Sequence, residues 1–350
     1  MTTEAIISPA PEAPWRTRSK SMLIWTLLAS VLPALVSLYI SSSLNLPGIV
    51  GLVLVFLPIQ LLAASLAAFA TAGKRGILDG ILTVTILFLM AIMGVLLTSV
   101  AFTLIQKGIA ALSAHAFYQN SVYITSVTSL EYGGLGHAIV GTLITVGIAV
   151  VFAVPIGIAA GAFLTESRSP MRGSVRFLSQ AMTGLPSIVS GLFVFALLFL
   201  TGLIERVAIL GSIALFLLML PTVIRLTEEV LKLVPQELRS AAIALGAPRH
   251  KAFFQVVFPT ARSGIITACL LGTARIIGET APLIVLVSYA PATNFNPLEG
   301  SMASLPTYIF AWLKFSTEIA TQRAWGAALA LMILVGILFS LARFFGRKRY

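Results

Sequence analysis

Eight long apolar runs divide this sequence into pieces of membrane-spanning length. A bilayer core of roughly 30 Å is crossed by about 20 apolar residues in a helix, and a helix bonds its backbone polar groups internally. The runs therefore predict an all-α fold, a polytopic transmembrane bundle with eight spans. They lie at residues 22–42, 48–72, 78–105, 137–164, 177–200, 207–226, 264–289 and 324–343.

The composition of the chain indicates that much of its surface faces lipid. Hydrophobic residues make up 58% of the sequence and charged residues only 10%, whereas soluble domains average about 25% charged residues. The net charge of +11 could indicate nucleic acid in a soluble protein. Here the basic residues lie in short loops between apolar runs, as in membrane proteins. We therefore expect membrane lipid, and no nucleic acid, as a partner.

The distribution of lysine and arginine predicts the orientation of the chain. Most basic residues fall in the two termini and in alternate loops, and such loops face the cytoplasm. We therefore expect a multi-pass protein of the bacterial inner membrane with both termini cytoplasmic. The few basic residues of the opposite loops are Lys107, Arg206, Lys314 and Arg323.

Three segments are predicted along the chain. Residues 1–21 form a polar N-terminal segment, and residues 22–76 form a two-span hairpin without charge inside its spans. Residues 77–350 form a six-span domain that includes a long cytoplasmic loop at 227–263. The hairpin is expected to be an appended element that packs against lipid.

The loop at 227–263 has a helix–turn–helix pattern. Leu238, Ala241, Ala242 and Leu245 recur at helical spacing, and Gly246 then supplies a helix-ending residue. A second short amphipathic stretch at 251–258 is expected to end at Pro259. By pattern alone the loop could be an ordinary amphipathic helix at the membrane surface.

The spacing in this loop resembles the coupling loop of permease subunits of ATP-binding-cassette (ABC) importers. That family carries Glu-Ala-Ala, three residues, Gly, nine residues, then Ile-x-Leu-Pro; this chain has serine, valine and phenylalanine in place of three of these. Glu237 is a candidate for the missing acid. The resemblance implies docking on an ATPase subunit through Glu237, Ser240, Ala241, Ala242, Gly246, Val256, Phe258 and Pro259.

The chain lacks the pattern of a nucleotide-binding loop. That loop needs Gly-x4-Gly-Lys followed by Ser or Thr, and the only such Lys, Lys20, is preceded by Ser19. We therefore expect no cofactor in this chain and no enzymatic activity. ATP and magnesium are expected to bind to the separate ATPase partner.

The apolar run at 264–289 contains Arg275 and Glu279, charges that are costly inside a bilayer. A spacing of four places both on one face of a continuous helix. One interpretation is an intrahelical ion pair that tethers neighbouring spans. The other is a pathway lining in which Arg275 compensates the charge of a crossing anion, since a guanidinium suits phosphate oxygens.

The string RIIGETAPL at 275–283 resembles phosphate permeases of the PstA type, which have the MetI-like fold. The resemblance extends over residues 82–347. It implies a substrate pathway at Arg275, Glu279 and Thr280, and import of inorganic phosphate. It also implies three partners: a PstC-type permease in a heterodimer, a homodimeric ABC ATPase and a periplasmic phosphate-binding protein.

Other functions are kept as alternatives. A permease for phosphonate, sulfate or molybdate would share the same class, whereas an ion-coupled secondary transporter would need no coupling loop. A structural membrane scaffold would leave the embedded charges as an ion pair only. His115, His137 and His250 lack metal-ligand spacing and are expected to be ordinary surface residues. No nucleophile–base pattern is evident, so catalytic and metal-binding residues are not expected.

Overall fold

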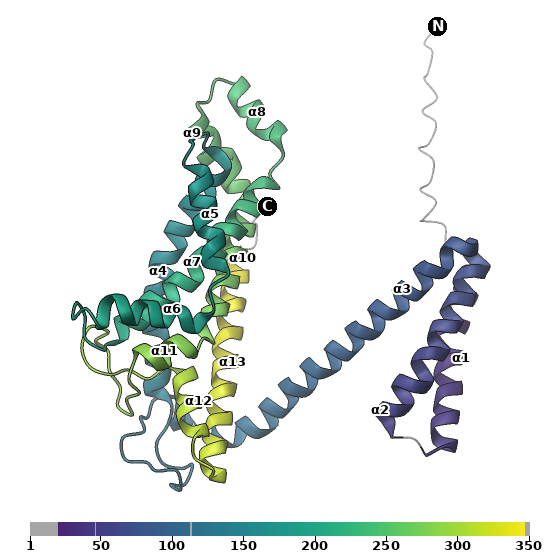
Figure 1. Cartoon of the computed structure of the whole chain (residues 1–350), viewed down its shortest axis with the longest axis horizontal. Helices are drawn as coiled ribbons and strands as arrows, with labels where there is room; N and C mark the ends of the chain where they lie inside the picture. Colours follow the sequence, from purple (N-terminus) through teal and green to yellow (C-terminus); the bar gives the residue numbers. More distant parts are fainter. Residues whose placement is uncertain (1–19, 46, 113, 347–350) are drawn as a thin grey trace. The chain divides into compact units, whose positions relative to one another are not determined.

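The computed structural model describes residues 20–45, 47–112 and 114–346, and all regular structure in these ranges is helical (Figure 1). The prediction of an all-α fold is confirmed. The chain divides into two compact units, residues 1–101 and 102–350.

The first unit contains α1 (Lys20–Ser43), α2 (Gly48–Val50), the π-helical segment η1 (Gly51–Phe56) and most of α3 (Leu57–Gly108). Gly73 interrupts α3 with φ 68° and ψ −156°, a conformation that favours glycine. The segments before and after this kink pack closely, since a Cβ on Gly80 would lie 2.9 Å from the carbonyl oxygen of Ala64. Gln60, in the first turn of α3, ties this helix to α1 by donating to the carbonyl of Ala29 at 2.8 Å.

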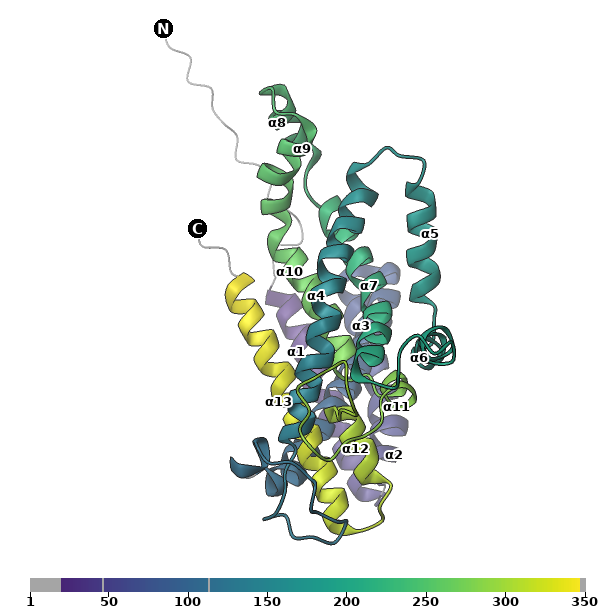
Figure 2. The same ribbon diagram turned by 90° about the vertical axis from the view of Figure 1, so that its left-hand side faces the viewer.

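The second unit is built around four long helices. They are α4 (Gly136–Glu166), α7 (Ala208–Lys232), α10 (Phe258–Ile277) and α13 (Glu318–Gly346), which lie side by side in Figures 1 and 2. The short helices α8 (Gln236–Ala244) and α9 (Arg249–Ala252) lie at one end of this bundle, and α12 (Leu305–Leu313) lies at the other.

Shorter helical elements complete this unit. They are η2 (Ile109–Ala111), η3 (Ala114–Phe117), α5 (Arg172–Thr183), α6 (Ser187–Val194), η4 (Phe195–Phe199), η5 (Phe253–Val257) and α11 (Ala281–Leu286).

Small residues bring α4 and α7 into close contact. A Cβ on Gly157 would lie 2.6 Å from Cγ1 of Val223, and one on Gly161 would lie 2.8 Å from Cβ of Thr227. In lipid such close backbone approach provides much of the attraction between helices. The two glycines, four residues apart, therefore form the face on which α4 packs against α7.

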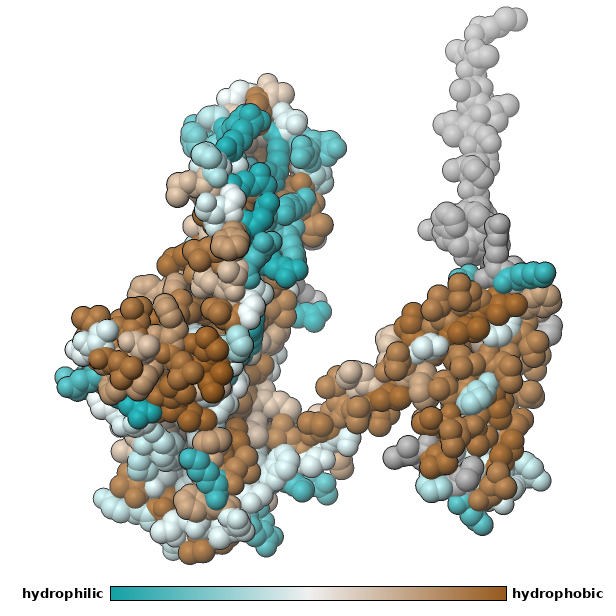
Figure 3. All heavy atoms as spheres, in the orientation of Figure 1, coloured by the Kyte–Doolittle hydropathy of each residue, from teal (hydrophilic) through white to brown (hydrophobic). Residues whose placement is uncertain are grey.

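The flank of the bundle is apolar, as expected of a surface in contact with lipid. Val151 and Phe152 on α4 are 66% and 57% exposed. Figure 3 shows hydrophilic residues gathered near α8, whereas hydrophobic residues cover α6. Burying such apolar surface in lipid is favourable, which fits a membrane-embedded bundle.

The predicted count of eight spans is not confirmed. Six of the described helices are long and apolar enough to cross a membrane, or seven if the bent pair α5 and α6 forms one span. The run at 177–200 is not one straight helix, because the chain bends by 107° between α5 and α6. Pro186 at this bend disfavours continuation of α5 because the residue before a proline avoids helical geometry. The first run lies in α1, within which Val31–Ser43 is a shorter apolar segment.

Candidate functional site

Arg275 lies in the last turn of α10 and is exposed. Its Nη1 donates to Oγ1 of Thr222 on α7 at 3.1 Å. In the described part of the chain, four ion pairs are found, and none of them involves Arg275. A guanidinium with one neutral partner retains most of its five donors for an anion.

Glu279 does not share a helix face with Arg275, contrary to the sequence-based expectation. α10 ends at Ile277, and Gly278 through Thr280 connect it to α11. Glu279 and Thr280 are partly buried in this connection. The break has a local cause: Pro282 lacks a backbone N–H and favours the first turn of a new helix.

The position of α11 is fixed from two sides. Arg206 donates from Nη2 to the carbonyl of Val285 at 2.7 Å, which satisfies an acceptor in the last turn of α11. On α6, a Cβ at Gly191 would lie 2.8 Å from Cα of Pro282. These contacts hold the segment that carries Glu279 against the bundle.

The predicted helix, glycine turn and second helix are present at the α8 end of the bundle. Gly246 has φ +86°, the left-handed conformation that ends many helices. Its neighbours Ile243 and Leu245 are exposed, Leu245 by 90%. The residues expected to dock an ATPase map onto α8 (Glu237, Ser240, Ala241 and Ala242), η5 (Val256) and the start of α10 (Phe258 and Pro259).

The second helix does not end at Pro259, contrary to expectation. Residues Arg249–Ile277 form one continuous helical stretch that includes α9, η5 and α10. The segment just before Pro259 is π-helical, and such a segment changes the bonding pattern near a residue that lacks an N–H. The motif residue Val256 is partly exposed, whereas its neighbour Val257 is buried.

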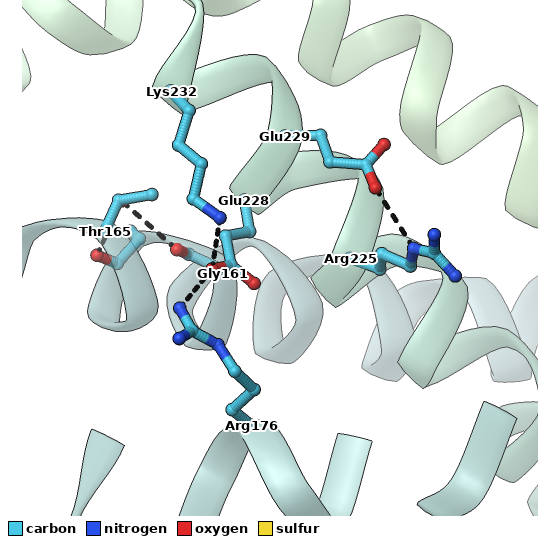
Figure 4. A network of polar contacts seen from close by, with 8 residues as sticks. Gly161, Thr165, Arg176, Arg225, Glu228, Glu229 and Lys232 are labelled. Atoms are coloured by element: carbon cyan, nitrogen blue, oxygen red, sulfur yellow. Dashed lines mark hydrogen bonds and ion pairs between the residues drawn. The ribbon is translucent and has the colours of Figure 1, made fainter. Parts of the chain in front are cut away.

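The structure also reveals polar residues that the sequence did not single out. Glu228 on α7 accepts from Nη2 of Arg176 on α5 at 2.5 Å and from Nζ of Lys232 at 2.7 Å (Figure 4). Arg176 and Glu228 are 52 residues apart, so no local pattern predicts their pairing. The spacing of four between Glu228 and Lys232 is the one signal that was available.

Arg323, counted only as a loop charge from the sequence, is 4% exposed. Its Nη2 donates to the carbonyls of Thr128, Ser129 and Tyr132 at 3.0, 2.7 and 2.9 Å. This arginine therefore ties α13 to the loop that precedes α4.

His137 is also buried, so the expectation of a surface histidine is wrong at this position. Its Nε2 lies 3.4 Å from the hydroxyl of Tyr289, and its ring is 5.5 Å from that of Tyr308. In the described ranges, no group of three His, Cys, Asp or Glu side chains is placed to hold a metal ion.

Together these features define a class: a polytopic helical membrane protein with an isolated arginine beside a broken helix and an exposed helical turn at one end. The family model "Binding-protein-dependent transport system inner membrane component" matches residues 153–349. The chain belongs to this family, and it is a multi-pass inner-membrane protein.

Named relatives agree with this assignment. The chain is 46% identical over 221 residues to "Phosphate transport system permease protein PstA" of Mycobacterium leprae, which covers 62% of this chain and 73% of the relative. It is 35% identical over 267 residues to the protein of that name from Pasteurella multocida, which covers 75% of this chain and 93% of the relative. The resemblance to permeases of the PstA type is confirmed.

Among solved structures, an inward-facing MetNI methionine ABC transporter matches with a TM-score of 0.48 at 17% identity. The match covers 59% of this chain and 92% of the other.

Proposed function

We propose that this chain is the transmembrane permease subunit of an ABC importer that carries inorganic phosphate across the inner membrane. The observation that carries the proposal is the 46% identity to a phosphate transport system permease over 73% of that relative's length. As a permease subunit the chain is not an enzyme, and a separate subunit hydrolyses ATP.

The geometry around Arg275 supports an anion as the transported species. Its guanidinium lies in an apolar helix without a carboxylate partner, so its charge is not neutralised within the described chain. An uncompensated cation in a low-dielectric setting attracts an anion strongly. The absence of an Arg275–Glu279 ion pair in the described residues favours the pathway interpretation over the tether interpretation.

The α8 end supports docking of an ATPase. An exposed, mostly apolar turn around Ile243 and Leu245 stands among hydrophilic residues, and apolar residues in such a setting mark contact surfaces. We propose that this turn, with residues 227–263, faces the cytoplasm and that both termini lie on the same side. The ATPase homodimer would bind ATP and magnesium there.

The remaining assembly is proposed from the family. A PstC-type permease would complete the membrane pathway as a heterodimer, and a periplasmic phosphate-binding protein would deliver the substrate. We propose that residues 77–350 form the MetI-like permease domain, that residues 22–76 form an appended hairpin, and that residues 1–21 precede it. The predicted first segment lies mostly outside the described residues.

A comparison of substrates tests the proposed function. A strain that lacks this chain is complemented with the wild-type gene, and uptake of labelled phosphate, phosphonate and sulfate is measured under energised conditions. We expect restored uptake of phosphate only, with loss of uptake when the partner ATPase is inactivated. Restored uptake of sulfate or phosphonate without phosphate would reject phosphate as the substrate, and uptake without an active ATPase would indicate a secondary transporter.

A further inference from the structure

A polar pocket lies between α5 and α7. It has a volume of about 610 Å³, and its wall contains three basic side chains, two carboxylates and three uncharged polar side chains. The polar lining residues are Arg176, Ser179, Gln180, Thr183, Arg225, Glu228, Glu229 and Lys232.

The charges in the pocket are paired in a way that leaves them accessible to a competitor. Glu228 is the least exposed of them, with 10% of its side chain exposed, and it lies between Arg176 and Lys232 (Figure 4). Its two cationic partners are 39% and 54% exposed. Ion pairs that open to solvent in this way exchange partners at small cost.

Residues on one face of α7 connect this pocket to Arg275. Thr222, which accepts from Arg275, lies one turn before Arg225, and Glu229 follows one turn later. Arg225 and Glu229 both line the pocket, and Nε of Arg225 donates to Glu229 at 3.0 Å. An anion that leaves Arg275 along this face meets Arg225 first and the Arg176–Lys232 pair next.

We propose that this pocket is a second oxyanion-binding site on the translocation pathway, in which the Glu228 carboxylate occupies the position of a passing phosphate. The inference rests on the proposed function, because it takes phosphate as the anion. A carboxylate and a phosphate both accept from guanidinium and ammonium groups, so either can lie between Arg176 and Lys232. Competition from Glu228 keeps phosphate binding weak, and conduction requires sites that release their ion readily.

The alternative is a purely structural lock between α5 and α7. The two interpretations predict different effects of Glu228→Gln on phosphate binding. Under the binding-site proposal, Glu228→Gln removes the competitor and strengthens phosphate binding, whereas Arg176→Gln removes a donor and weakens it. Under the structural alternative both substitutions break the same ion pair, so both lower the amount of folded protein and neither changes phosphate binding in a preferred direction.

Protection of a cysteine in the pocket measures phosphate binding there. Cys269 is the only cysteine of the chain, so Cys269→Ala with Gln180→Cys gives one reactive thiol at the pocket wall. The chain is purified in its complete importer complex, treated with N-ethylmaleimide at increasing inorganic phosphate, and its alkylation is followed by mass spectrometry. Sodium chloride at equal ionic strength is the control for screening.

We expect phosphate, and not chloride, to slow alkylation. Glu228→Gln should lower the phosphate concentration for half protection about tenfold, and Arg176→Gln should raise it by about the same factor, as expected for one charge-assisted hydrogen bond. Arg168→Gln is the matched control, because Arg168 is an exposed arginine before α5 that does not line the pocket. It should leave the midpoint unchanged.

Several outcomes would overturn the proposal. They are protection by chloride equal to that by phosphate, no protection at all, or shifts of the same sign in Glu228→Gln and Arg176→Gln. Phosphate uptake by the same importer in vesicles distinguishes failure of the pocket proposal from failure of the proposed function. Uptake without protection rejects the pocket as a site and leaves the proposed function intact, whereas an importer that does not take up phosphate rejects both.

Discussion

Arg239 on α8 forms an ion pair with Glu166, the last residue of α4, while its Nη2 donates to the carbonyl of Leu231 on α7 at 2.9 Å. One side chain therefore joins α8 to the ends of α4 and α7, the two helices that approach each other closely at Gly157 and Gly161. Rigid-body movement of a short helix is a common way to pass a conformational change between subunits. We interpret Arg239 as the residue that links docking at α8 to movement of α4 and α7.

Arg239→Gln should uncouple ATP hydrolysis from transport. An ion pair that is partly open to solvent contributes about 1 kcal/mol or less, so the amount of protein in the membrane should stay near normal. Phosphate uptake per ATP hydrolysed in proteoliposomes should fall severalfold. Arg249→Gln, on an exposed residue of α9, is the control and should keep normal coupling. Equal loss in both variants would refute a specific role for Arg239.

Gly246→Val should prevent association with the ATPase while the chain still inserts into the membrane. Apart from its chain neighbours, no atom of the described residues lies within 4 Å of a Cβ at this position, so the expected penalty comes from the φ of +86°, which costs a β-branched residue about 1–2 kcal/mol. Gly246→Asn is the matched control, since asparagine tolerates the left-handed region. Co-purification of the ATPase measures the effect, and normal recovery with valine would count against a docking role for this turn.

The sequence predicted the turn at Gly246 because this turn depends on residues close together in the chain. It did not predict the break after Ile277. An apolar run shows that a segment lies in lipid but not whether its helix is continuous, and the break depends on Gly278 and Pro282 as well as on α6 packing against Pro282.

Side-chain pairs across the bundle could not be predicted from the sequence. Arg176 meets Glu228 only because α5 folds back against α7. Burial of Arg323 and His137 likewise depends on loops that close over them, which hydropathy does not report. The positions of the coupling residues came from a resemblance, and whether they contact an ATPase stays a prediction.

Gly161→Ala should destabilise the chain. The new methyl group would lie 2.8 Å from Cβ of Thr227 and 3.0 Å from the carbonyl oxygen of Ile224, so α4 and α7 must move apart. Overpacking of this kind costs about 1–3 kcal/mol. Gly147→Ala on the same helix is the control, because no atom from the other described elements lies within 4 Å of its Cβ. Thermal unfolding of the purified complex should show a lower midpoint for Gly161→Ala only, and equal midpoints would contradict the contact.

Arg275→Gln should abolish phosphate uptake without lowering the amount of the chain in the membrane. The substitution removes the fixed positive charge that compensates the crossing anion, while the one hydrogen bond lost, to Thr222, is worth about 1 kcal/mol. Thr222→Val removes the same hydrogen bond and leaves the charge in place. It should therefore retain much of the uptake, as measured with labelled phosphate beside a membrane immunoblot.

The double change Arg275→Gln with Glu279→Gln distinguishes charge compensation from tethering. If Arg275 only neutralised Glu279, removal of both charges would leave no unpaired group and uptake would return. The separation of the two residues across the end of α10, without an ion pair between them in the described chain, predicts that uptake stays absent in the double variant. Recovery of uptake in the double variant, or loss of uptake in Thr222→Val equal to that in Arg275→Gln, would show that Arg275 acts as a structural tether and not as the cation of the pathway.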